Sequence, residues 1–322
     1  MSDTPKSMVE FSDVSKKLGG RQILDKLSFT VPQGETFVII GYSGSGKSVS
    51  LRHMVGLMKP DEGSIRVDGD EITTMSRKEL ELMRRKFGVL FQSGALIAWL
   101  TLFENVELPL IEHTRMSRQK RAEVVQQKLE LVNLWKDKDK FPAEISGGMK
   151  KRGGLARALA LDPELVLYDE PSSGLDPVIA YEVDKLINGL RDDHGMTQIV
   201  VTHDMESAYT IASRIGVFYH GQMIQVGTPD EIRTSEIPEV RHFITGGREG
   251  TVSMRSDAAI TRGVPPGLNS RREAAPQEAE EEQNGYVLLS EEEAAASANQ
   301  PSTEAPDLQP DPEHEESKHE SP

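Results

Sequence analysis

Two hydrophobic patterns alternate along the first 245 residues. Short apolar runs with the length of buried strands, mostly β-branched, occur at residues 36–40, 87–91, 165–168 and 198–202. Elsewhere, apolar residues recur at helical spacing on a charged background, most clearly over residues 117–134. Strands that alternate with helices in this way predict an α/β fold built on a mainly parallel sheet.

Two helix starts are marked by their capping residues. Ser76 and Glu79 have the spacing of a capping box. Asp176 followed by Pro177 places a capping residue and a proline where helix starts prefer them. Further short strands are predicted at residues 8–11, 27–31, 64–67, 215–219 and 223–226.

Two regions are predicted as additions to the parallel sheet. The first 35 residues read as short strands and turns, and the stretch from about residue 101 to 161 reads as wholly helical. A glycine-rich turn at residues 146–148 opens the last helix of that stretch.

The composition changes near residue 247. Pro, Ser, Ala, Gln and Glu dominate from there, which predicts a disordered tail because few apolar residues are left to offset the ordering entropy. Residues 246–322 hold 17 acidic and 6 basic residues, a net charge of −11 out of −15 for the chain. The apolar run Tyr286 to Leu289 is either a chance cluster or a short motif that docks on a partner or on the body.

Charge and composition exclude several classes of protein. The nearly balanced body gives no electrostatic reason to expect nucleic-acid binding. The chain has no cysteine, which excludes disulfides and cysteine metal sites. Residues 1–14 lack the pattern of a secretory signal. No run reaches the roughly 18–20 apolar residues of a membrane span, so we expect a soluble polypeptide whose membrane role, if any, runs through a partner.

A complete Gly-x-x-x-x-Gly-Lys-Ser loop follows the apolar run at residues 36–40. It comprises Gly41, Tyr42, Ser43, Gly44, Ser45, Gly46, Lys47 and Ser48, and a helical stretch begins at Val49. Between a strand and a helix, such a loop cradles phosphates with backbone N–H groups and the helix dipole. Lys47 supplies a full charge for the β and γ phosphates, and the Ser48 hydroxyl can ligate Mg²⁺. The loop therefore predicts a nucleoside triphosphate as ligand, rather than a glycine turn with a chance lysine.

Two carboxylates, Asp169 and Glu170, follow the buried run at residues 165–168. A carboxylate at the end of a buried strand beside a phosphate loop is placed to hold Mg²⁺ through water, and we assign this role to Asp169. Glu170 can polarise an attacking water. The alternative is a pair of solvated acids at a strand end.

The order of these motifs resembles that of ATP-binding-cassette (ABC) ATPases over residues 8–245. The matching segments after the phosphate loop are Phe91-Gln92, Ser146-Gly147-Gly148, Asp169-Glu170, Ser173-Gly174-Leu175-Asp176 and Val201-Thr202-His203-Asp204. The resemblance implies a RecA-like P-loop NTPase core with an N-terminal antiparallel β subdomain. It also implies an α-helical signature subdomain at about residues 92–161, and the tail at residues 246–322 follows the cassette.

The resemblance implies roles for two polar residues near the nucleotide. Gln92 matches the glutamine loop, which senses Mg²⁺ and water and faces the transmembrane partner. His203 matches the switch histidine, which contacts the γ phosphate and orients the glutamate. By itself, a histidine at a strand end is more often a structural hydrogen-bonding group.

The resemblance also implies a dimer. Ser146, Gly147 and Gly148 match the family signature, which binds the γ phosphate of the nucleotide held by the opposite subunit. Asp176 matches the loop that crosses the dimer interface. Two copies of the chain would then sandwich two ATP molecules, ATP closing the dimer and hydrolysis reopening it.

The sequence departs from the family pattern in three places. Leu18 stands where an aromatic ring usually stacks on adenine, so that Tyr42 or another group is expected to compensate. Met149 replaces the usual glutamine after the signature glycines. Gly153 and Gly154 weaken a helix by roughly 1 kcal/mol each relative to alanine, which indicates close backbone packing at a contact between two helices.

Residues 91–96, 102–106 and 108–110 resemble the Mla-type branch of the family, whose permeases move lipids between the membranes of diderm bacteria. The apolar residues after the glutamine loop are either a contact surface for the permease or ordinary core of the helical subdomain. The branch implies a cassette at the cytoplasmic face of the inner membrane. Its partners would be a permease, a lipid-binding Mla D-type protein and a small STAS-domain protein. The alternatives are a cassette of a small-solute importer and a soluble, non-transport ABC ATPase.

Overall fold

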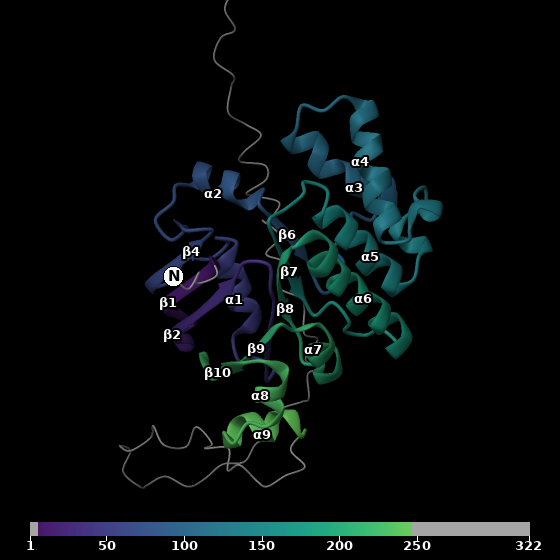
Figure 1. The fold of residues 1–322 in the computed structure, drawn as a ribbon. Coiled ribbons are helices and arrows are strands. Elements are labelled where there is room, and N and C mark those ends of the chain that lie inside the picture. The colour runs from purple at the N-terminus through teal and green to yellow at the C-terminus, as the bar shows by residue number, and fades with distance from the viewer. Residues whose placement is uncertain (1–5, 247–322) are drawn as a thin grey trace, which may run out of the picture. The chain divides into compact units, whose positions relative to one another are not determined.

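The structure is a computed structural model that describes residues 6–246 (Figure 1). The chain divides into two units, Met1–Ser256 and Asp257–Pro322, and all the described residues belong to the first. The tail predicted from residue 247 onward, with Tyr286 to Leu289, lies outside the described residues.

A six-stranded sheet in the order β10-β9-β3-β8-β7-β6 forms the centre of the described body. All neighbouring strands in it are parallel except β10, which pairs antiparallel with β9 at one edge. Its strands are β3 (Thr36–Gly41), β6 (Phe87–Leu90), β7 (Leu165–Asp169), β8 (Thr197–Val201), β9 (Arg214–Tyr219) and β10 (Gln222–Gly227). The predicted mainly parallel sheet is confirmed.

A second, antiparallel sheet has the order β2-β1-β4-β5. It contains β1 (Ser7–Leu18), β2 (Arg21–Pro32), β4 (Glu62–Val67) and β5 (Asp70–Glu71). The expectation of short strands in the first 35 residues is wrong, because β1 and β2 form one hairpin of two 12-residue strands. Bulges along their pairing and polar residues on the exposed side interrupt the apolar pattern that would have revealed this length.

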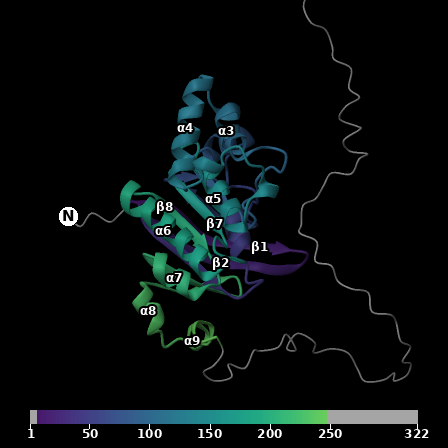
Figure 2. The ribbon, with the colours of Figure 1, turned by 90° about the vertical axis from the view of Figure 1, so that its right-hand side faces the viewer.

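The helices cover the two sheets and extend beyond them (Figures 1 and 2). They are α1 (Lys47–Met54), α2 (Arg77–Arg84), α3 (Leu102–His113), α4 (Arg118–Leu131), α5 (Gly147–Ala158), α6 (Pro177–His194), α7 (Met205–Ile211), α8 (Pro229–Arg233) and α9 (Pro238–Ile244), with short 3-10 turns at Trp135–Asp137 and Pro142–Glu144. In both views α3 and α4 lie at one end of the described body and α8 and α9 at the other. Among residues 6–246, no helix combines the length and apolarity that crossing a bilayer requires.

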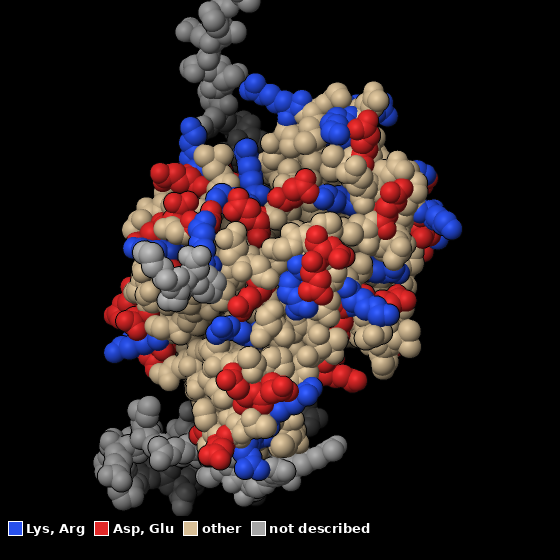
Figure 3. All heavy atoms as spheres, viewed as in Figure 1, with Lys and Arg blue, Asp and Glu red and all other residues tan. Residues whose placement is uncertain are grey.

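The predicted helix starts at Ser76 and Asp176 are confirmed. The Ser76 hydroxyl accepts from the Glu79 N–H while the Glu79 carboxylate accepts from the Ser76 N–H. Asp176 caps α6 by accepting from the N–H groups of Val178 and Ile179. On the face seen in Figure 3, acidic and basic side chains are interspersed, which fits the expected balance of charge on the body.

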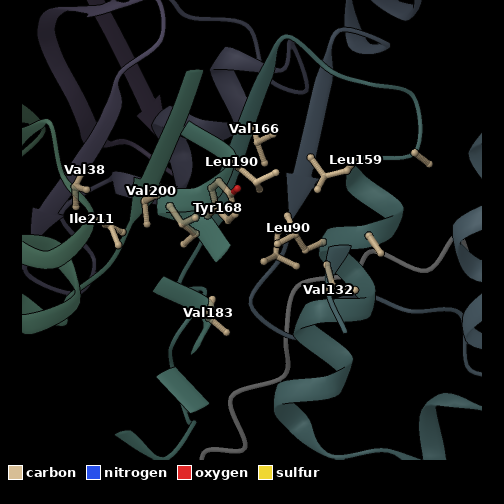
Figure 4. Close-up of a cluster of buried hydrophobic side chains, with 14 of the residues drawn as sticks. Val38, Leu90, Val132, Leu159, Val166, Tyr168, Val183, Leu190, Val200 and Ile211 are labelled. Carbon is tan, nitrogen blue, oxygen red and sulfur yellow. The ribbon is translucent and has the colours of Figure 1, made fainter. Parts of the chain in front are cut away.

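The strands of the parallel sheet alternate between two apolar clusters. In β3, Phe37 and Ile39 contact the cluster that includes the antiparallel sheet and α1. Val38 and Ile40 belong to the other cluster, which includes the helices α3 to α7. Figure 4 shows part of this second cluster, with Val38 and its counterparts from β7 and β8 among the labelled side chains. Because successive side chains of a strand point to opposite faces, β3 contributes to both apolar clusters.

A buried polar contact joins β7 and β8 on one face of this sheet, at Tyr168. Its hydroxyl donates to Gln198 Oε1 at 2.6 Å, and Gln198 Nε2 donates to the Ile187 carbonyl at 2.7 Å. Burial raises the pKa of Tyr168 far above its usual range, so the group stays a neutral donor. We expect Tyr168→Phe to lower the free energy of unfolding by about 1–3 kcal/mol, because Gln198 Oε1 loses its donor in the core.

Denaturant titrations measure this loss. Tyr181→Phe is the matched control, since Tyr181 is 53% exposed and its hydroxyl is free to bond with water. An equal loss of stability in the two variants would contradict the role given to the Tyr168 contact.

Candidate nucleotide site

The phosphate loop connects the end of β3 to the start of α1. Gly46 precedes α1 as its N-terminal cap residue, in a left-handed conformation with φ 111°. At Gly41, φ is 153°, and an added Cβ would lie 2.3 Å from the carbonyl oxygen of Phe218 on β9. Only glycine fits that position, so β9 fixes the path of the chain into the loop.

Lys47 begins α1 and is almost completely buried, with 8% of its surface exposed. Its Nζ donates to the carbonyl oxygens of Gly41 at 2.7 Å and Tyr42 at 2.9 Å. Burial lowers the pKa of the Lys47 ammonium, whereas the nearby carboxylates of Glu170 and Asp169 act to raise it. The loop therefore holds a desolvated cation where the phosphates are expected.

Asp169 ends β7 and reaches the helix that follows the loop. The Ser48 hydroxyl donates to Asp169 Oδ1 at 3.2 Å, a contact between residues 121 positions apart. Burial raises the pKa of Asp169, and the bond from Ser48 opposes this by lowering it. A hydroxyl and a carboxylate side by side at a phosphate loop fit Mg²⁺, which is bound by one or two carboxylates plus substrate phosphates. In the described part of the chain, no cluster of three or more His, Cys, Asp or Glu could hold a metal ion.

Glu170 comes directly after β7 and His203 lies just beyond β8, the neighbouring strand. Glu170 has a left-handed backbone with φ 54°. Its N–H donates to the Val201 carbonyl at 2.9 Å, and its Oε2 lies 2.8 Å from His203 Nδ1. The predicted pairing of a carboxylate with a histidine is thus present in the fold, and neither residue is an isolated surface group.

Gln92 follows β6, the strand on the other side of β7. Its Nε2 donates to Ser173 Oγ at 3.3 Å. Gln92 lines one pocket of about 500 Å³ together with Ile23, Ser43, Gly44, Gly46, Lys47, Ser48, Val49, Asp169, Glu170 and His203. Ten of the predicted site residues therefore meet in one place, while Gly41, Tyr42 and Ser45 belong to the loop without lining the pocket.

Tyr42, one of the groups expected to compensate for the missing aromatic ring, does not line the pocket. Its ring packs edge-on against Phe243 of α9, with centroids 5.0 Å apart. Leu18, at the end of β1, does not line the pocket either. Ile23 of β2 does, and the sequence reasoning missed it. Its neighbour Leu24 is fully buried, so alternation along β2 is the signal that would have placed Ile23 on the opposite side.

The signature residues are absent from this pocket. Ser146 caps α5 by accepting from the Met149 N–H at 3.2 Å, and Ser146 and Gly147 are exposed. An added Cβ at Gly148 would lie 2.5 Å from Ile179 of α6, so the start of α5 packs against the turn that Asp176 caps. The signature and Asp176 thus lie beside each other, and neither lines the nucleotide pocket of its own chain.

Comparison with known proteins agrees with this geometry. The family described as "ABC transporter" matches residues 24–173. The chain is 42% identical over 249 residues to the "Probable ribonucleotide transport ATP-binding protein mkl" of Mycobacterium tuberculosis, covering 77% of this chain and 69% of the relative. It is 38% identical over 258 residues to the "Intermembrane phospholipid transport system ATP-binding protein MlaF" of Escherichia coli, covering 80% and 96%.

A solved structure extends the comparison to the fold. The dimeric, post-hydrolysis state of the ATP-binding cassette MJ0796 bound to ADP and phosphate matches with a TM-score of 0.65 and 34% identity, covering 69% of this chain and 99% of that one. The match extends over nearly the whole of that cassette, so the two chains share a fold. The chain therefore belongs to the ABC transporter family, as one of its ATP-hydrolysing nucleotide-binding cassettes.

Proposed function

We propose that two copies of this chain clamp two ATP molecules, each between the phosphate loop of one copy and the signature of the other. The observation that carries the proposal is the separation of the two phosphate-binding elements: Ser146 and Gly147 are exposed at the start of α5, and neither they nor the buried Gly148 line the pocket of the same chain. A helix start with free N–H groups binds anions. Ser146, Gly147 and Gly148 thus complete a site in a second copy, and Asp176 lies at the contact between copies.

The residues of the pocket divide the work of hydrolysis. Lys47 and the N–H groups of residues 43–49 bind the phosphates. Glu170 accepts a proton from the attacking water, and His203 orients its carboxylate through the 2.8 Å contact. Mg²⁺, held by Ser48, Asp169 and Gln92, would supply charge neutralisation at the β and γ phosphates.

The proposed cargo is a phospholipid or related lipid, moved between membranes by an Mla-type permease. The identity to MlaF over 80% of the chain supports this assignment. The relative named for ribonucleotide transport gives the competing cargo. In the proposed assembly the cassette lies at the cytoplasmic face of the inner membrane, bound to the permease, with a lipid-binding Mla D-type protein and a STAS-domain protein as further subunits.

The surface after the glutamine loop supports the contact with a permease. Leu102, Val106 and Leu110 are buried, so the interpretation as ordinary core holds for these positions. Trp99, however, is 78% exposed, and Phe91 beside Gln92 is 42% exposed. We take these two exposed apolar side chains, which flank the glutamine loop in the sequence, as part of the proposed contact with the permease.

Reconstitution tests the proposal. The full-length chain, purified with the membrane subunits that it retains, is placed in donor vesicles with fluorescent phospholipid. ATP-dependent transfer to acceptor vesicles supports the lipid assignment. Uptake of labelled ribonucleotide without lipid transfer would show that the cargo is a ribonucleotide and not a lipid. Purification without any membrane subunit would contradict the transport role.

A further inference from the structure

Lys151 is a buried lysine on the signature helix α5, and the roles above make no use of it. Only 6% of its surface is exposed. Its Nζ donates to the carbonyl oxygens of Glu170 at 3.0 Å and Ser173 at 2.5 Å. Within residues 6–246 no carboxylate lies within ion-pair distance of this ammonium. The lysine therefore bonds the backbone of the turn that carries the hydrolytic carboxylate.

That turn has an unusual backbone. Glu170 is left-handed, with φ 54°, a conformation that costs a non-glycine residue roughly 1 kcal/mol or more. Its carbonyl also accepts from the Ser173 N–H at 3.3 Å. A charged donor on the same carbonyl stabilises this peptide orientation more strongly than a neutral donor does. The position of the Glu170 carboxylate, 2.8 Å from His203, depends on the orientation of that peptide.

The glutamine loop packs against the same helix. Gln92 donates to Ser173 Oγ at 3.3 Å, so Lys151 and Gln92 bond different atoms of Ser173. An added Cβ at Gly94 would lie 2.6 Å from the Lys150 carbonyl oxygen, and one at Gly154 would lie 2.5 Å from the Gly94 carbonyl oxygen. The close packing expected at Gly154 is therefore present, but its partner is the glutamine loop and not a second helix.

We propose that Lys151 is a positioning residue for hydrolysis, which transmits the arrival of the partner copy's ATP at the start of α5 to the Glu170 turn of its own chain. Lys151 lies five positions after Ser146, about 7.5 Å along the helix axis. A shift of α5 towards a phosphate at its N-terminus would thus move the ammonium that holds the Glu170 and Ser173 carbonyls. The inference rests on the proposed ATP sandwich and on the role of Glu170 in it.

With this coupling, Glu170 of each chain is positioned for hydrolysis only when the other nucleotide is bound. A lysine that only filled space in the core would contribute to stability and to nothing else. Burial lowers the pKa of the Lys151 ammonium, and the charge of Glu170 acts to raise it. The charge of Glu170 thus acts on the Lys151 ammonium although no ion pair joins the two side chains.

Substitution of Lys151 in the full-length protein tests the inference. Lys151→Met keeps the length of the side chain and removes the donors, and Lys150→Met is the matched control on the same helix. We expect Lys151→Met to lower kcat about tenfold or more, the effect of losing a charged hydrogen bond, with the Kd of fluorescent ATP within about twofold. The Ser173 amide should also exchange hydrogen faster. Lys151→Arg, which can still donate to both carbonyls, should recover most of the turnover, and Lys150→Met should match the parent protein.

The outcomes separate this inference from the proposed function. Parent-like turnover in Lys151→Met, together with loss of turnover in Glu170→Gln, would overturn the role of Lys151 alone. Retained turnover in Glu170→Gln would overturn the proposed hydrolytic site. Equal losses of affinity, turnover and melting temperature in Lys151→Met would show a purely structural lysine and overturn the inference. If Lys151→Met does not fold, Lys151→Gln, which keeps one donor group, is measured against the same criteria.

Discussion

Replacing Glu170 with glutamine should lower ATP turnover by about 10²–10⁴-fold, the usual contribution of a general base, and leave ATP binding intact. The amide has nearly the shape of the carboxylate, so the contact with His203, 2.8 Å away in the parent protein, can still form. An amide does not accept the proton of the attacking water. The bound state should therefore persist, and because ATP is proposed to close the dimer, the variant should accumulate as an ATP-bound dimer.

Two measurements on the same preparation check this expectation. Phosphate release gives the turnover, and light scattering coupled to gel filtration with ATP gives the mass of the particle. Glu123→Gln is the matched control, because Glu123 lies exposed on α4, where it pairs with Lys120 at 3.1 Å. Unchanged turnover would show that Glu170 is not the general base. A monomer that binds ATP but never doubles in mass would contradict the sandwich.

The sequence predicted the features that depend on neighbouring residues. The phosphate loop, the capping box at Ser76 and the cap at Asp176 each involve groups within a few positions of one another. Such signals are complete in a short window, since the donors and acceptors of a helix start come from the same turn. The element types of the parallel sheet followed from the same local reasoning.

The arrangement of the site depends on contacts between residues that are far apart in the sequence. Gln92, Glu170 and His203 meet because β6, β7 and β8 are adjacent. The carboxyl ends of parallel strands share one edge, which is where α/β folds bind ligands. The sequence of a single strand does not determine which strands lie beside it in the sheet. The resemblance to a known family implied only that these residues serve one nucleotide site, and in the structure they line one pocket.

The misses have the same physical origin. Lys151 contacts a carbonyl 19 positions away, and Tyr42 packs on Phe243, which lies near the end of the described sequence. Neither contact produces a periodic pattern of apolar residues. The lengths of β1 and β2 were missed because polar side chains and bulges obscure alternation in strands with an exposed side.

Replacing Lys47 with alanine should weaken ATP binding about 100-fold, through the loss of charged hydrogen bonds to phosphate of about 3 kcal/mol. The side chain lines the pocket with Asp169 and Glu170. Without its charge the pocket keeps two carboxylates that repel a polyphosphate. Titration with fluorescent ATP measures the change, and Lys78→Ala, which removes an exposed lysine of α2, is the control. Affinity equal to that of the control would contradict the cradle.

The stability of the nucleotide-free Lys47→Ala variant should not fall together with its affinity for ATP. Burial lowers the pKa of Lys47, which means that its charged form is less favourable in the folded protein than in the unfolded chain. Removing the ammonium relieves this cost but also leaves the Gly41 and Tyr42 carbonyls without their donor, so the melting temperature of the nucleotide-free protein should change little. The parent protein should gain melting temperature when ATP is added, because a ligand that binds only the folded state stabilises it, and Lys47→Ala should lose most of that gain. A variant that melts earlier without nucleotide would show that Lys47 stabilises the fold. The expected pair of results instead assigns this buried charge to phosphate binding, at no benefit to the empty protein.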